Sequence, residues 1–360
     1  GTFKVFLLAG QSNMEGHAVV DLDHPDHYNG GRGNLERTLD SNPDFARRFE
    51  GLRDEQGEWT TRDDVWCWYR PWKGPLKAGP LSIGFAVYEG DHHFGPELGI
   101  GRVLGDSIEA PVLLIKTAWG GKSLQVDFRP PSREGATGPF YERMLKEYRE
   151  GLADARRKFP GLEGLEPELA GFFWFQGWND MVDSGTYPTR GQPGSYDAYS
   201  KNLAHFIRDV RRDLKAPKLP FVIGVMGAGG PIAKYSPDQM RYAGIHGEFR
   251  KAMAAPTKLP EFKGNVTAVF TENYWDGQLS ELVDRRGKIN AKRRELAKDQ
   301  SLTRAQRDKA IAEFTDEIFT REEQAILEAG VSNAAYHYLG SAKILTQIGQ
   351  AFAEALVAME

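Results

Sequence analysis

The chain has 360 residues, of which 40% are hydrophobic, and its formal net charge is −4. This length is enough for a large buried core, and the weak negative charge argues against the basic surface that nucleic acids or anionic membranes bind. No apolar run reaches the roughly 18–20 residues that span a bilayer. The single cysteine, Cys67, excludes internal disulfides and multi-cysteine zinc sites, and its apolar and aromatic neighbours predict a buried strand position.

Short apolar segments alternate along the chain with segments of helical periodicity. Five of them are expected to be buried strands, at residues 3–8, 111–117, 170–175, 220–226 and 265–270. The clearest helical stripes lie at residues 196–214 and 341–356. This alternation predicts one α/β domain over residues 1–360, with a five-stranded parallel sheet and helices on both faces.

Two insertions are expected to interrupt this domain. Residues 277–323 are dense in charges at helical spacing and predict a solvated helical hairpin. Residues 21–93 contain Trp59, Trp66, Trp68 and Trp72, which could stack on sugar rings, although core packing is expected for at least two of them. Residues 21–27 include metal-ligand residue types at no standard spacing, so we expect a solvated loop and no metal site.

A serine follows the first predicted strand in the segment Gly10-Gln11-Ser12-Asn13-Met14. Ligands of open α/β sheets bind beyond the carboxyl ends of the strands, so Ser12 is a candidate nucleophile. Its hydroxyl could instead only cap the helix that follows.

Three further segments could supply chemistry at the same edge of the sheet. A glycine pair, Gly120-Gly121, follows the second strand and would let backbone N–H groups approach a ligand, although a plain tight turn is also compatible with it. Asn179 follows the third strand and could donate to an oxyanion, or form a turn with Asp180. His337 precedes the last helix and is the histidine best placed to reach Ser12.

These four segments, in this order, resemble the motifs of the SGNH hydrolases, and in particular of carbohydrate esterases of the sialate O-acetylesterase type. The third motif, Gly-X-Asn-Asp, is matched by residues 177–180, although the sialate esterases usually have a glutamate where this chain has Trp178. The resemblance implies a flavodoxin-like three-layer fold. It also implies that Ser12 is the nucleophile and His337 the general base and acid, with an oxyanion hole made by the Ser12 and Gly121 N–H groups and the Asn179 amide.

The chain departs from this family pattern near the histidine. Many relatives have an aspartate three residues before it, where this chain has Ala334, and Asn333 cannot supply a carboxylate. We expect a backbone carbonyl of this loop, such as that of Ala334, to accept the imidazole Nδ1–H and give a Ser-His dyad. The alternative is Asp276, from the loop after the fifth strand.

The resemblance implies a serine esterase that removes acetyl groups from an acetylated oligo- or polysaccharide without a cofactor or metal. It places Gln11, Glu97 and Gln176 near the substrate, and Glu97 could instead support the loop around Ser12. A general base of ordinary pKa predicts a rate that rises with pH through an ionisation near neutrality. We expect no nucleic-acid or membrane partner, and export with a leader absent from this sequence. The alternatives are a non-catalytic glycan-binding protein and a lipase or thioesterase of the same superfamily.

Overall fold

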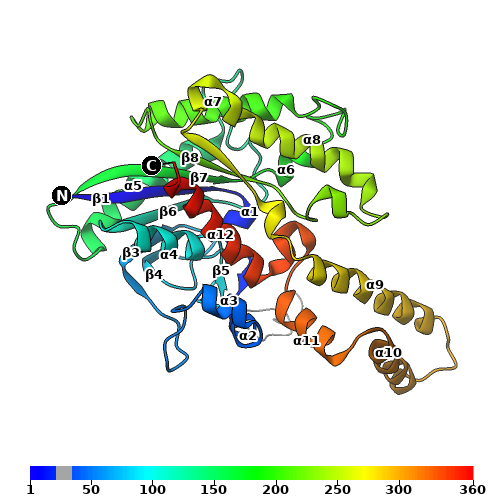
Figure 1. Ribbon diagram of the computed structural model, residues 1–360. Coiled ribbons are helices and arrows are strands. Elements are labelled where there is room, and N and C mark those ends of the chain that lie inside the picture. Colours follow the sequence, from blue (N-terminus) through cyan, green and yellow to red (C-terminus); the bar gives the residue numbers. More distant parts are fainter. Residues whose placement is uncertain (22–34, 360) are drawn as a thin grey trace.

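The computed structural model describes residues 1–21 and 35–359, and a seven-stranded sheet forms its centre (Figure 1). The strand order is β4-β3-β6-β1-β7-β8-β9, and all neighbours are parallel except β3 and β4. The strands are β1 (Thr2–Gly10), β3 (Arg62–Tyr69), β4 (Lys77–Leu81), β6 (Val112–Ala118), β7 (Glu166–Phe175), β8 (Phe221–Val225) and β9 (Val266–Phe270). All five expected strands are therefore present.

The prediction of five strands is wrong in number, because the first insertion adds two. Strand β3 pairs in parallel with β6, and β4 extends the sheet at its edge. Burial explains this arrangement: Trp66, Cys67 and Trp68 of β3 are 8%, 0% and 1% exposed. The expected core packing of two tryptophans is confirmed. Trp72 remains exposed, so it could still meet a ligand.

Successive residues of β1 point to opposite faces of the sheet, as the period of a strand requires. Phe3, Val5 and Leu7 pack on one face with α5 (Pro139–Lys158) and α7 (Asp197–Asp213). On the other face, Phe6 and Leu8 join a separate core cluster with α4 and α12. Helices α4 (Glu97–Ser107) and α12 (Ala342–Val357) meet at two glycines, Gly99 and Gly349, where a Cβ on either would lie under 3 Å from the backbone of the other segment. The predicted three-layer α/β architecture is confirmed.

The second insertion is helical, as predicted, and consists of α9 (Gly277–Ala297) and α10 (Arg304–Ile318), followed by α11 (Arg321–Gly330). These helices project away from the sheet (Figure 1). A small apolar cluster that includes Leu279, Leu282 and Leu339 joins α9 to the loop before α12.

Shorter elements complete the described chain. They are α1 (Ser12–Glu15), β2 (Ala18–Val19), α2 (Leu35–Ser41), α3 (Pro43–Arg48), β5 (His93–Phe94), α6 (Trp178–Met181), α8 (Ala243–Ala254) and the 3-10 segments η1 (Ile232–Lys234), η2 (Met240–Tyr242), η3 (Ala255–Lys258), η4 (Pro260–Phe262), η5 (Thr271–Tyr274) and η6 (Ala335–Gly340). Apart from residue 21, the metal-like segment 21–27 lies outside the described residues. Within the described ranges, no helix has the length and apolar character needed to cross a membrane.

Candidate active site

Ser12 lies at the carboxyl end of the central strand β1, as the first residue of α1 (Figure 1). The chain turns there at Gly10, where a Cβ would lie only 2.0 Å from the carbonyl oxygen of Phe175. Glycine is therefore required for β1 and β7 to stay this close where the turn begins. The structure places partly exposed Ser12 at the sheet edge predicted for it.

The loop that carries His337 reaches the same place from the other end of the chain. His337 lies in η6, directly before α12. Asn13 Nδ2 donates a 2.9 Å hydrogen bond to the carbonyl oxygen of Tyr336. This bond joins the residue after Ser12 to the residue before His337, so it brings the two candidate side chains to one edge of the sheet.

The backbone that follows His337 is held in an uncommon conformation. Tyr338 and Leu339 have φ of 52° and 62°, in the left-handed region that non-glycine residues seldom adopt. The Tyr338 hydroxyl accepts from the backbone N–H of Gly227 at 2.9 Å and lies 2.7 Å from the Thr271 hydroxyl. These anchors, just beyond β8 and β9, stabilise a strained loop of the kind found at functional sites.

The His337 imidazole packs against His17, a residue that the sequence analysis missed. The two ring centroids are 4.0 Å apart and the ring planes differ by 14°. His17 Nδ1 lies 3.0 Å from the Tyr88 hydroxyl, and His17 Nε2 lies 3.9 Å from Glu15 Oε1. The available signal was position, because His17 lies three residues after the end of the first motif.

Neither group expected to orient His337 does so through a hydrogen bond. The Ala334 carbonyl accepts instead from the backbone N–H groups of His337 and Leu339, each at 3.0 Å. Asp276 caps α9 by accepting from the Leu279 N–H at 3.1 Å, and its other oxygen binds Lys343 Nζ at 3.1 Å. Among the described residues, His337 Nδ1 has no hydrogen-bond partner. The His17 ring contacts the His337 imidazole instead, and the anchored loop fixes the backbone that carries it.

Burial, with a smaller contribution from the neighbouring His17, lowers the pKa of His337 to about 3. The imidazole is therefore uncharged at neutral pH and can accept a proton. A pKa in this range predicts that the acid limb of the pH–rate profile lies well below neutrality, which differs from the expectation drawn from the sequence.

Asn179 is held by the side chain of Gln11. Gln11 Nε2 donates to Asn179 Oδ1 at 2.7 Å, while Gln11 Oε1 accepts from the Gly177 N–H at 3.1 Å. Because Oδ1 is engaged, the Asn179 amino group is the end left to donate. Gln11 and Gln176 are only 4% and 3% exposed, so little of either side chain is accessible to a substrate.

Buried Asp180 connects the glycine turn to the asparagine motif. Its carboxylate accepts from the backbone N–H groups of Leu124 and Gln125 at 2.8 and 3.0 Å, and from Gln176 Nε2 at 2.6 Å. Burial raises the pKa of Asp180 to about 6 against the opposing effect of these hydrogen bonds. Gly121, with φ of 72°, is exposed and has open space around its Cα. Its role as an oxyanion donor stays a prediction.

Glu97 is fully buried, so its carboxylate is not accessible to a substrate at the surface. Its Oε2 accepts from Lys116 Nζ at 2.8 Å, and its Oε1 accepts from the Gly95 N–H at 2.9 Å. Lys116 Nζ also donates to the carbonyl oxygen of Glu15 at 3.0 Å, at the end of α1. Of the two uses expected for Glu97, this arrangement corresponds to support of the loop around Ser12 and not to contact with sugar hydroxyls.

A hydroxyl, an uncharged imidazole and an anchored amide donor thus gather at one edge of an α/β sheet, which are the groups that serine hydrolases use for acyl transfer. The family model described as carbohydrate esterase, sialic acid-specific acetylesterase, matches residues 2–257. The chain therefore belongs to this family and is a carbohydrate O-acetylesterase, which confirms the resemblance seen in its motifs. The matched range contains Ser12 and Asn179 and ends before His337.

Individual relatives are distant. "Probable carbohydrate esterase At4g34215" of Arabidopsis thaliana is 24% identical over 242 residues, which are 66% of this chain and 74% of the relative. The X-ray structure of the Arabidopsis thaliana protein of the same designation covers 99% of both chains at 15% identity, with a TM-score of 0.47. The crystal structure of XAC1771, a novel carbohydrate acetylesterase from Xanthomonas citri, aligns with 74% of this chain and 49% of its own at 15% identity, with a TM-score of 0.37. The family assignment rests on sequence.

Proposed function

We propose that the protein removes acetyl groups from hydroxyls of an acetylated oligo- or polysaccharide through an acyl-enzyme on Ser12. His337 takes the Ser12 Oγ proton as Oγ attacks the acetyl carbonyl carbon. The Asn179 amide and the N–H groups of Ser12 and Gly121 stabilise the resulting oxyanion. The sugar oxygen leaves with the proton from His337. In the second half of the reaction, His337 takes a proton from a water molecule as the water oxygen attacks the acetyl-serine carbonyl carbon. Ser12 Oγ then leaves with that proton, and acetate is released.

The observation that carries this proposal is the hydrogen bond from Asn13 to the Tyr336 carbonyl. It joins the serine motif and the histidine loop at neighbouring residues, 2.9 Å apart between Nδ2 and O. The uncharged state of His337 supports its role as the base, because a protonated imidazole could not accept the serine proton.

Among the described residues, none forms a hydrogen bond with His337 Nδ1, which is compatible with a Ser-His dyad. In triads the acid holds the imidazole in one orientation and stabilises its charged form. Here the orientation comes from the His17 ring and the anchored η6 loop. All groups in the proposed steps belong to the protein or to water, so the proposal includes no cofactor. Export of the protein stays a prediction.

Acetate release tests the proposal directly. Purified wild type and Ser12→Ala are incubated with p-nitrophenyl acetate and with a panel of acetylated glycans, and acetate is measured by mass spectrometry. We expect Ser12→Ala to lose at least a thousandfold in kcat, as nucleophile removal does in serine hydrolases. Equal turnover by the variant would remove Ser12 from the mechanism, and sugar binding without acetate release would favour the non-catalytic glycan-binding protein.

A further inference from the structure

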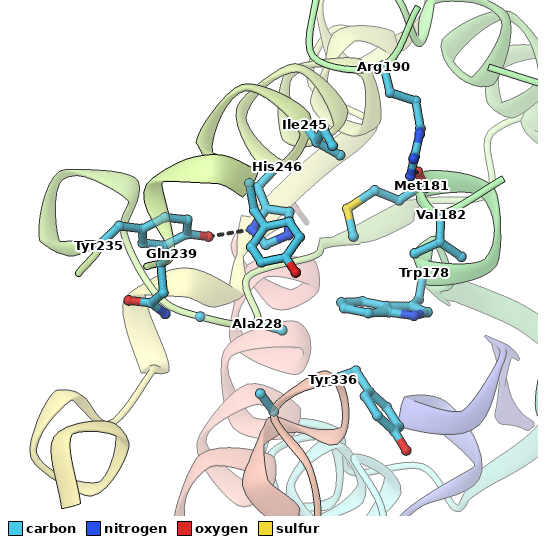
Figure 2. Close-up of a pocket in the computed structure, with 13 residues that line it drawn as sticks. Trp178, Met181, Val182, Arg190, Ala228, Tyr235, Gln239, Ile245, His246 and Tyr336 are labelled. Carbon is cyan, nitrogen blue, oxygen red and sulfur yellow. Dashed lines mark hydrogen bonds between the residues drawn. The ribbon is translucent and has the colours of Figure 1, made fainter. Parts of the chain in front are cut away.

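A cavity of about 480 Å³ lies beside the proposed catalytic residues. Trp178 and Tyr336 line it, with ring centroids 5.7 Å apart, and they directly precede Asn179 and His337 in the sequence. Figure 2 shows these two aromatic rings on one side of the cavity, with the residues of α8 and the turn before it across from them. The cavity therefore lies next to the segments that carry the proposed amide donor and the proposed base.

The size and lining of the cavity exceed what an acetyl group requires. Cavities of about 300–1,000 Å³ hold whole small molecules, whereas an acetyl group has two carbons. Most of its lining is aliphatic or aromatic, including Trp178, Met181, Val182, Tyr242, Ile245 and Tyr336. None of the described lining residues is an aspartate or glutamate.

Several polar atoms of the lining already take part in hydrogen bonds. The Tyr235 hydroxyl lies 2.6 Å from His246 Nδ1 and accepts from Arg250 Nη2 at 3.0 Å. Burial, with a smaller contribution from the charge of Arg250, lowers the pKa of His246 to about 4, so this ring is neutral at neutral pH. Gln239 Oε1 accepts from the backbone N–H of Ser236 at 2.9 Å, which leaves its amino group as a donor.

Arg190 provides the one charge among the described lining residues at neutral pH. It donates to the carbonyl oxygen of Met181 at a long 3.4 Å and forms no ion pair within 4 Å to a described carboxylate. The cavity thus combines aromatic walls with donors, and its described lining has no carboxylate to accept from a sugar hydroxyl. Sugar hydroxyls need acceptors for their protons, and burying a hydroxyl without one costs roughly 1–3 kcal/mol.

We propose that this cavity binds an aromatic ring of the ester substrate, with Arg190 donating to an oxygen acceptor on that ring. The ring packs between Trp178 and Tyr336 on one side and Tyr242 and Ile245 on the other. The inference rests on the Ser12 mechanism of the proposed function and goes beyond its acetylated-sugar substrate. The bond changes are the same: Ser12 Oγ bonds to the acyl carbon, the ester C–O bond breaks, and water releases the acid. The ring can belong to the acyl half or to the alcohol half of the ester.

Three esters separate these sources: methyl 4-methoxycinnamate carries the ring on the acyl side, 4-acetoxybenzoate carries it on the alcohol side, and ethyl acetate has no ring. Acid release by wild type, Arg190→Met and Ile245→Trp gives kcat/KM for each ester. The matched control is Leu76→Trp, because Leu76 is 36% exposed in the turn between β3 and β4, at the opposite edge of the sheet. Thermal melts establish that each variant is folded.

For each ring ester, the quantity compared is its kcat/KM divided by the kcat/KM of ethyl acetate. We expect Arg190→Met and Ile245→Trp each to lower this ratio at least fivefold for one of the two ring esters. Leu76→Trp should leave this ratio within twofold of wild type. The proposal is overturned if wild type cleaves ethyl acetate and both ratios are unchanged in the two cavity variants, or if the variants instead impair only an acetylated xylo-oligosaccharide. Loss of all ester hydrolysis in wild type would instead reject the proposed function.

Discussion

Replacing His17 by alanine removes the ring that packs against the proposed base. The two imidazoles are stacked with centroids 4.0 Å apart, and His337 Nδ1 has no hydrogen-bond partner among the described residues. A contact between rings contributes about 0.5–1.5 kcal/mol beyond its buried area. If this contact holds His337 in its reactive orientation, its loss corresponds to a fall of about 2- to 13-fold in kcat, with little change in KM.

His17→Phe is the matched variant, because it keeps a flat ring and removes the titratable nitrogens. We expect it to recover most of the kcat that His17→Ala loses. His17 also contributes to lowering the pKa of His337, so the phenylalanine variant should raise that pKa and move the acid limb of kcat/KM to higher pH. If the His17 variants only lost stability, the amount of folded enzyme would fall, but the acid limb of the pH profile would stay at the same pH.

The assay is p-nitrophenyl acetate hydrolysis from about pH 2.5 to 9, so that the acid limb of the wild type is included. The kcat and KM values are fitted separately, and protein unfolding is followed in the same buffers. Tyr88→Phe serves as a control for the hydrogen bond to His17 Nδ1, because it keeps the histidine ring in place. Wild-type kcat and an unchanged pH profile in both His17 variants would refute the reasoning.

Three further outcomes are expected. Wild-type kcat/KM should stay within twofold from pH 7 down to pH 5, because burial lowers the pKa of His337 to about 3. A pH–rate profile that falls roughly 25-fold over this range would instead show an ordinary histidine pKa of about 6.5. Lys116→Met leaves the carboxylate of Glu97 buried without its cation. Chemical denaturation should therefore show a loss of about 3–5 kcal/mol in the free energy of unfolding. The double variant with Glu97→Leu is the check, because it should recover this loss. Gln11→Ala frees the Asn179 amide and should lower kcat by up to about a hundredfold with KM nearly constant, whereas an unaltered kcat would exclude Asn179 as an oriented donor.

Local sequence was sufficient for much of the fold. The five apolar segments are strands, and Ser12 lies at the carboxyl end of the first, because burial on both faces of a parallel sheet leaves a continuous apolar run in the sequence. The run around Cys67 was also recognisable as a buried strand. Its membership of the main sheet was not, because the pairing of Val65 with Val112 joins segments that are distant in the chain and have no local signature.

The sequence by itself determined the residue types of the site, through motifs whose spacing is local: the serine turn, the glycine pair, the Asn-Asp pair and the histidine before the last helix. Only the tertiary structure decided the partners of these groups. It placed His17 on His337, directed Asp276 to the N-terminus of α9 and buried Glu97 with Lys116. The reason is physical: ring contacts, ion pairs and the exclusion of water that lowers an imidazole pKa all depend on which remote segments pack together, and local propensity does not contain that information.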